Sequence, residues 1–329
     1  MGKKNSRTYT LLHPLPKKIG EKPLVTPSGQ RTELGNSVLE NIRHTQGKIR
    51  DFPSYVHQIL TEGGITAVIK ATAPESGGFV GASMNPQDRR ITFIVADERG
   101  ASTARPGLLA AHEGFHGVDY TVGKWMADEG MGLQKQELER RSKNYQQTLL
   151  SDHPLIKDAY EKDMSKIPAG IGQLGLNLSH YLPSNKGGHP MQGMVGARVE
   201  AFAEMMALAA GERNEPTERE KQEYKEIFTH VKGDIAQLRE AAIKKLFPRT
   251  IAVAEKLHSE MGALTVDAGS NSIRPAVIAL VKALPHTLEN YLPADKLKAI
   301  EGQGVTKLDP QHFLHPTTNK ATPAPDVMK

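Results

Sequence analysis

The sequence predicts an α+β fold, with strands early in the chain and a mainly helical C-terminal part. Residues 65–71 (ITAVIKA) and 90–96 (RITFIVA) are rich in β-branched residues and bounded by Gly, Pro and Asn, so they predict strands. From Pro106 onward, apolar residues recur at helical spacing instead. A few strands followed by helices, with no internal repeat, indicate an α+β protein.

The first 50 residues are basic and contain several prolines, and they predict an N-terminal arm that is partly disordered. A short helix is expected within residues 34–49, and another over residues 52–60. Residues 77–81, between the two predicted strands, are expected to add a third strand or one arm of a hairpin.

A helix is predicted to begin at Pro106, because proline suits the first helical turn. Four residues follow at spacings of four, three and four, which places them on one face of this helix. They are Leu108, His112, Phe115 and Asp119. Gly123 is expected to stop or kink the helix.

Residues 124–166 are charged and rich in glutamine, and they predict one or two exposed helices. Residues 168–196 contain many glycines and prolines and predict a loop. We therefore expect residues 124–190 to form an insert that acts as a lid or wall over a cleft. A strong helix is expected over residues 195–210, ended by Gly211.

The remaining chain is expected to be helical. One helix is predicted from about Thr217 to Phe247, and two or three more over residues 249–303, with breaks at Gly269 and Pro285. The expected organisation is an arm (1–50), a catalytic domain (51–250), a helical region (251–304) and a flexible tail (305–329).

Composition excludes several classes of site and gives little indication of partners. The 329 residues include no cysteine, which excludes disulfides, thiolate catalysis and Cys-based zinc sites. The net charge of +5 is a weak indication of an acidic partner and does not predict nucleic-acid binding. No apolar run is long enough to span a bilayer, and no secretory signal is evident. Export by a signal-peptide-independent route, into a host cell, or else a cytoplasmic location is expected.

The segment His112-Glu113-Gly114-Phe115-His116 predicts a metal site. Residues four apart on a helix lie one turn above each other, so the two imidazoles of His112 and His116 point to one place. Glu113 lies about 100° round the helix, where its carboxylate reaches a metal-bound water without ligating the metal. This arrangement is typical of metal-assisted hydrolysis with Zn²⁺.

The third ligand must come from another element, because no histidine follows His116 at the spacing of six that one zinc-protease pattern requires. Glu200, on the predicted helix 195–210, is the best candidate. Glu204, one turn further on, is expected to accept the free N–H of a ligand histidine. The alternative is that both are solvated residues beside the buried stripe of that helix.

The segments AHEGFHGVDY and VEAFAEMMAL together resemble the gluzincin metallopeptidases, most closely the catalytic domain of anthrax lethal factor and its relatives. The resemblance implies a zincin-like fold with a small sheet over the HEGFH helix. It also implies that His112, His116 and Glu200 are zinc ligands, that Glu113 is the general base, and that Glu204 supports a ligand histidine.

Two departures from this family concern the spacing and the oxyanion-stabilising group. His116 and Glu200 lie 84 residues apart, which is longer than expected for the family, and residues 193–196 lack its usual tyrosine. Tyr181 is the chosen replacement. His180, His189 and Tyr120 are the alternatives. Asp119 has two possible roles: a hydrogen-bond acceptor behind a metal ligand, or a residue on the surface of the helix.

The sequence thus predicts a zinc metalloendopeptidase acting on a protein substrate, as a secreted bacterial effector or toxin-like protease. The segment 90–96 is expected to be the sheet edge on which the substrate lies. The alternatives are a zinc amidase, or another non-peptide hydrolase, and a catalytically idle binding protein. Residues 1–6 (MGKKNS) match an N-myristoylation pattern, although a free basic N-terminus is the favoured interpretation, with peripheral membrane contact through it as one option. The oligomeric state is left open.

Overall fold

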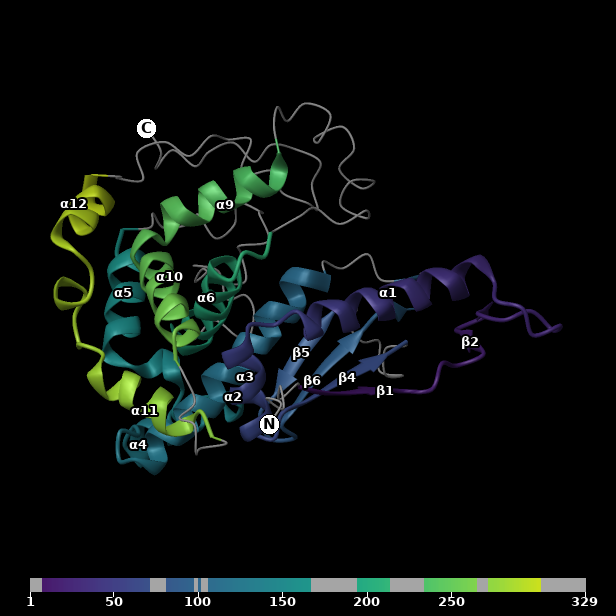
Figure 1. Ribbon diagram of the computed structural model, residues 1–329, viewed down its shortest axis with the longest axis horizontal. Coiled ribbons are helices and arrows are strands. Elements are labelled where there is room, and N and C mark those ends of the chain that lie inside the picture. The colour runs from purple at the N-terminus through teal and green to yellow at the C-terminus, as the bar shows by residue number, and fades with distance from the viewer. Residues whose placement is uncertain are drawn as a thin grey trace, which may run out of the picture.

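The structure, a computed structural model, describes residues 8–71, 81–97, 100–101, 106–166, 194–213, 234–264 and 272–302. It is a mixed α+β molecule with one small sheet and many helices (Figure 1), as the sequence predicts. The main sheet contains β1 (Tyr9–Leu12), β4 (Thr66–Lys70), β5 (Ala82–Asn85) and β6 (Arg90–Ile94). Two small antiparallel pairs join β2 (Lys18–Ile19) to β3 (Lys22–Pro23) and β7 (Ala96–Asp97) to β8 (Gly100–Ala101).

Helices make up most of the remaining described chain. They are α1 (Glu33–Arg50), α2 (Ser54–Glu62), α3 (Pro106–Asp128), α4 (Lys135–Glu139), α5 (Pro154–Met164), α6 (Met194–Ala209), α9 (Ile235–Leu246), α10 (Pro248–Gly262), α11 (Arg274–Ala283) and α12 (Ala294–Gly302). The described residues also include three short 3₁₀ helices, η1 (Lys143–Tyr145), η2 (Leu150–Asp152) and η4 (Leu288–Asn290). No helix in the described ranges is long and apolar enough to cross a bilayer.

The strand order β1-β4-β6-β5 confirms the two predicted strands but corrects the predicted sheet edge. β6 pairs with β4 on one side and with β5 on the other, so residues 90–94 of the segment 90–96 are internal to the sheet. The edges are β1, which is parallel to β4, and β5, which is antiparallel to β6. Residues 77–80 of the expected third strand lie outside the described residues, and β5 follows directly after them.

The N-terminal 50 residues belong to the fold instead of forming a separate arm, at least from Thr8 onward. β1 forms a sheet edge, and α1 is an 18-residue helix whose apolar face is buried against the core. His57 on α2 accepts the backbone N–H of Thr8 at 3.0 Å, which fixes the start of β1. The predicted arm is wrong for these residues because residues 9–12 pair with residues 66–69. Such pairing between distant segments cannot be inferred from local composition.

Helix α3 is central to the molecule, since it contacts α1, α2, α6, α11, η2, β5 and β6. Its residues from 110 to 123 are all buried, so the helix has no solvent-facing side over nearly four turns. Gly123 does not end it, and the helix continues to Asp128. The glycine is needed because the chain crosses there: an added Cβ would lie 2.2 Å from the Thr148 carbonyl oxygen and 2.3 Å from Leu149 Cα.

Residues 124–166 are only partly the exposed helices that the sequence predicts: α4 has no buried residue, but the later part of the segment belongs to the core and is not a lid. α5 and η2 contribute large buried side chains to the core, and η2 packs on both α3 and α6. The buried apolar residues are Leu149, Leu150, Leu155, Ile156 and Tyr160. The rest of the expected insert, from residue 167 to residue 190, lies outside the described residues.

The C-terminal part is helical, as predicted, where the structure describes it. α10 packs against α2, α5, α6, α9 and α12, so the hydrophobic core extends beyond the sheet into the helical part. The expected break at Pro285 separates α11 from η4. Gly269, most of the helix expected from Thr217, and residues 303–329 lie outside the described residues. The helix expected over residues 195–210 is present as α6.

Replacing Gly123 by alanine is expected to destabilise the protein, although alanine is the better helix former. The new methyl group meets backbone atoms that cannot rotate away, and overpacking of this kind costs about 1–3 kcal/mol. Gly47→Ala in α1 is the matched control, because only a flexible arginine end lies near its Cβ, at 3.9 Å. Thermal unfolding followed by circular dichroism should show a lower Tm for Gly123→Ala and an equal or higher Tm for Gly47→Ala. Equal behaviour of the two variants would contradict the crossing.

Candidate metal centre

Two buried helices, α3 and α6, bring together the residues that the sequence singles out. His112 and His116 lie one turn apart on α3, and Glu200 and Glu204 lie one turn apart on α6. The exposed fraction of both histidine side chains is 7 %, and that of Glu200 is 15 %. The site is therefore enclosed on its helical side and reaches solvent only narrowly.

Three ligand atoms converge on one point. His112 Nε2 lies 2.9 Å from His116 Nε2, and Glu200 Oε2 lies 3.1 Å from the first and 3.3 Å from the second. Such a set of two imidazoles and one carboxylate can hold a metal ion. The sequence prediction of these three residues as one group agrees with this geometry.

The size of this triangle can be compared with what a metal ion requires. Ligands that lie about 2.0–2.1 Å from a tetrahedral Zn²⁺ lie roughly 3.3 Å from one another. The three observed distances, 2.9 to 3.3 Å, are close to that value. The donor set leaves a fourth position without a protein ligand among the described residues, as in catalytic sites. The residues present therefore fit a tetrahedrally coordinated ion.

Glu204 supports one ligand directly. Its Oε2 lies 3.2 Å from His112 Nδ1, and its side chain is 3 % exposed. A carboxylate at this nitrogen holds the ring with Nδ1 protonated and Nε2 free to ligate. Glu204 is thus not a solvated residue. The Nδ1 atom of His116 is buried and has no hydrogen-bond partner among the described residues.

The charges of these groups are strongly coupled. Burial would lower the pKa of His112, but its hydrogen bonds to Glu200 and Glu204 raise it well above its usual value. Burial would raise the pKa of Glu200, but the charge of His116 and the hydrogen bonds from both histidines bring it below its usual range. The carboxylates of Glu200 and Glu204 create a negative field at this site, which a bound cation would neutralise once the ligand histidines have lost their extra protons.

Glu113 lies beside the ligand set and does not belong to it. Its side chain is buried, and its Oε2 atom has no hydrogen-bond partner in the described part of the chain. The carboxylate accepts the backbone N–H of Met84, on the edge strand β5. Burial raises the pKa of Glu113, while the charges of His116 and His112 lower it. The result is a carboxylate with one unused oxygen between the metal ligands and the sheet edge.

Asp119 has a structural position that neither sequence interpretation anticipated. It is fully buried, and it accepts the backbone N–H of Ser151 at 2.7 Å and the hydroxyl of Ser151 at 2.9 Å. Burial raises its pKa to about 6. Asp119 therefore attaches η2 to the metal helix and is not a surface residue.

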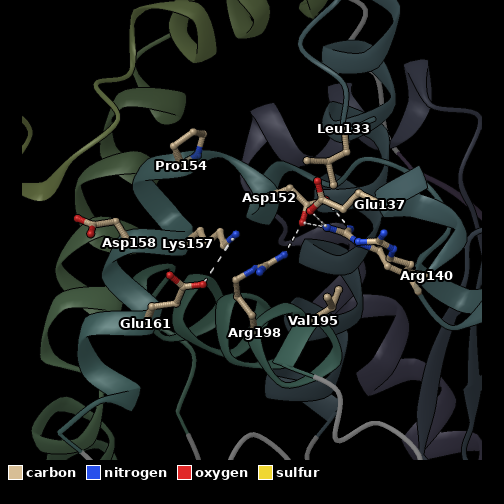
Figure 2. Close-up of a pocket in the computed structure, with 11 residues that line it drawn as sticks. Leu133, Glu137, Arg140, Asp152, Pro154, Lys157, Asp158, Glu161, Val195 and Arg198 are labelled. Carbon is tan, nitrogen blue, oxygen red and sulfur yellow. Dashed lines mark hydrogen bonds and ion pairs between the residues drawn. The ribbon is translucent and has the colours of Figure 1, made fainter. Parts of the chain in front are cut away.

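The next residue of η2 attaches the same turn to α6. Asp152 accepts two hydrogen bonds from Arg141, both at 2.8 Å, and one from Arg198, which lies two residues before Glu200 (Figure 2). These three residues border a pocket of about 590 Å³ whose wall carries acidic and basic side chains in similar number. Since Arg198 and Glu200 belong to one helix, this buried ion cluster helps to set the position of Glu200.

Tyr145 is a residue near the site that sequence reasoning missed. It packs with Tyr120, Leu149 and Val199. Burial raises the pKa of Tyr145, and the charges of Glu200, Asp119 and Glu113 raise it further. No motif spacing could have identified it, because η1 lies far from both metal helices in the sequence.

Tyr120, weighed from the sequence as an oxyanion-stabilising group, lies in the same cluster. Burial raises its pKa, as do the neighbouring Tyr145 and Asp119. Tyr181, the preferred candidate, lies outside the described residues, as do His180 and His189.

Comparison with protein-family models, with curated proteins and with solved structures found no match to this chain. The resemblance to gluzincins therefore depends on the two motif helices alone.

One divalent ion is expected to bind per chain, held by His112, His116 and Glu200. Isothermal titration of the chelator-treated chain with Zn²⁺ should give one site. His112→Ala/His116→Ala should abolish that site, whereas the matched control His13→Ala/His44→Ala, at two exposed histidines, should leave it unchanged. Glu204→Ala should weaken binding by about 10–100-fold. Bound Zn²⁺ at a hundred times its Kd should add about 2.7 kcal/mol to the free energy of unfolding. Full Zn²⁺ binding by the double variant would contradict the ligand assignment.

Proposed function

We propose that the chain is a zinc-dependent metalloendopeptidase that hydrolyses peptide bonds of a protein substrate. The observation that carries the proposal is the buried triangle of His112, His116 and Glu200 with the carboxylate of Glu113 beside it. A purely structural metal site has four protein ligands and needs no adjacent base. Here three ligands and a buried, partly unpaired carboxylate match the requirements of hydrolysis.

When bound, Zn²⁺ supplies Lewis acidity, which lowers the pKa of water and polarises a carbonyl group. Glu113 then takes the proton from the attacking water on its free Oε2 and delivers it to the leaving nitrogen. Burial raises the pKa of Glu113, which makes its carboxylate a stronger base than an exposed glutamate. Met84 holds the other part of this carboxylate in place through its backbone N–H.

The substrate is proposed to lie along β5, not along the segment 90–96. β5 is the edge strand beside α3, and its Met84 N–H already contacts Glu113. An extended peptide paired with this edge would have its backbone close to the metal ligands. This position supports a peptide substrate over a small amide, because only an extended chain uses a strand edge.

Glu113→Gln is expected to abolish turnover while metal content and fold remain as in the wild type. The amide is nearly isosteric and cannot accept the proton, and general-base catalysis contributes about 10²–10⁴-fold. Cleavage of a peptide library, read by mass spectrometry, measures turnover, and elemental analysis measures zinc.

Glu139→Gln, at an exposed glutamate of α4, is the control and should cleave like the wild type. A Glu113→Gln chain that holds zinc and still cleaves at a normal rate would show that the base is another residue. A wild-type chain that holds zinc and hydrolyses acetylated amino-acid amides but no peptide would favour an amidase.

Tyr145→Phe is expected to lower kcat by about 10²–10³-fold with little change in KM, because the lost hydroxyl would stabilise the oxyanion. Tyr160→Phe removes a buried hydroxyl from α5 and serves as the matched control, because Tyr160 is not a candidate for this role. A Tyr145→Phe enzyme with normal kcat, together with an inactive Tyr181→Phe enzyme, would assign this role to Tyr181.

A further inference from the structure

The first strand and the turn after it expose large apolar side chains. The exposed fractions are 66 % for Tyr9, 42 % for Leu11, 40 % for Leu12 and 38 % for Leu15. These are the exposed large hydrophobic residues of the described chain, and they fall within seven consecutive positions. Exposed apolar side chains gathered in one place indicate an interaction surface.

The same part of the chain carries all of the net positive charge. Residues 1–31 contain seven basic residues and one acidic residue, a net charge of +6, whereas the whole chain carries +5. The remaining residues therefore sum to −1. The basic residues are Lys3, Lys4, Arg7, Lys17, Lys18, Lys22 and Arg31.

Three described members of this set are accessible and lie close to the apolar residues in the sequence. Lys17, Lys18 and Lys22 are exposed and follow β1 directly in the chain. In Figure 1, β1 runs along the edge of the sheet toward β2, which lies at the end of the molecule farthest from α5, α10 and α12. We call Tyr9, Leu11, Leu12, Leu15 and the lysines 17, 18 and 22 the N-terminal surface.

We propose that the N-terminal surface docks on an anionic membrane. Apolar side chains that enter the headgroup region and lysines that attract anionic lipids act together in peripheral binding. A second copy of this chain is a poor occupant, because two surfaces of the same charge repel each other. A strand added to β1 would pair with its backbone but leave exposed side chains on both faces of the strand, since Leu11 and Leu12 are neighbours. A layer of lipid headgroups can surround this strand and contact the side chains on both of its faces.

Vesicle sedimentation of the full-length, unmodified chain tests the proposal. Vesicles of phosphatidylcholine alone are compared with vesicles of two parts phosphatidylcholine and one part phosphatidylserine. We expect binding to the second kind only, weakening as NaCl is added. Lys17→Glu/Lys18→Glu/Lys22→Glu should lower the partition coefficient by roughly a hundredfold or more. Tyr9→Ser/Leu11→Ser should lower it as well, and both variants alter exposed residues only.

The control Lys135→Glu/Lys143→Glu/Lys298→Glu makes the same change in net charge at exposed lysines elsewhere, and it should bind like the wild type. An equal loss of vesicle binding in this control would mean that net charge alone drives binding. That result would contradict the assignment of binding to the N-terminal surface. Absence of binding to phosphatidylserine vesicles, or equal binding to both vesicle types, also overturns the proposal. So does a concentration-dependent dimer, seen by analytical ultracentrifugation, that disappears in Tyr9→Ser/Leu11→Ser.

Discussion

The burial of four ionisable side chains between α3 and α6 is the constraint on which the rest of the structure depends. Ionisable groups removed from water are costly unless each finds a charged or metal partner. His112, His116, Glu200 and Glu204 satisfy one another only if the two helices meet in one register. The turn at η2 enforces that register, because Ser151 binds Asp119 of α3 and Asp152 binds Arg198 of α6. A metal ion would add the positive charge that this arrangement favours.

The parts of the site that follow helical periodicity could be predicted from the sequence. A spacing of four places His112 above His116, and Glu200 above Glu204, whatever the surrounding fold. The partners of these helices could not be predicted, since they depend on contacts between distant segments. β5 became the sheet edge, and Tyr145 came near the ligand set, through such contacts. The protease activity, the zinc and the exported location remain predictions.

The charged segment 124–166 shows why composition misled the prediction of exposure. Charged residues are usually solvated, but here several of them are buried as pairs, with Arg141 held by Asp152 and Arg249 by Asp163. The attraction between well-placed partners offsets part of the cost of removing each charge from water, so a polar sequence can occupy the interior. Periodicity of apolar residues cannot reveal such pairs, because the two partners lie on different elements. Among the described residues, Asp119 is buried without a charged partner in this way, because the backbone N–H and hydroxyl of Ser151, on a different element, satisfy its carboxylate.

The crossing of the chain over Gly123 has a consequence for recognising related sequences. The HExxH motif is short, and chance matches to it are common in unrelated proteins. A chain that keeps the crossing, however, has no room for a side chain seven residues after its second histidine. Gly117, whose added Cβ would lie 2.5 Å from Leu60 Cδ2, imposes a similar but softer demand one residue after that histidine. The two glycines therefore add a steric requirement to the motif. This longer pattern can distinguish related chains from chance matches when the overall sequence similarity is low.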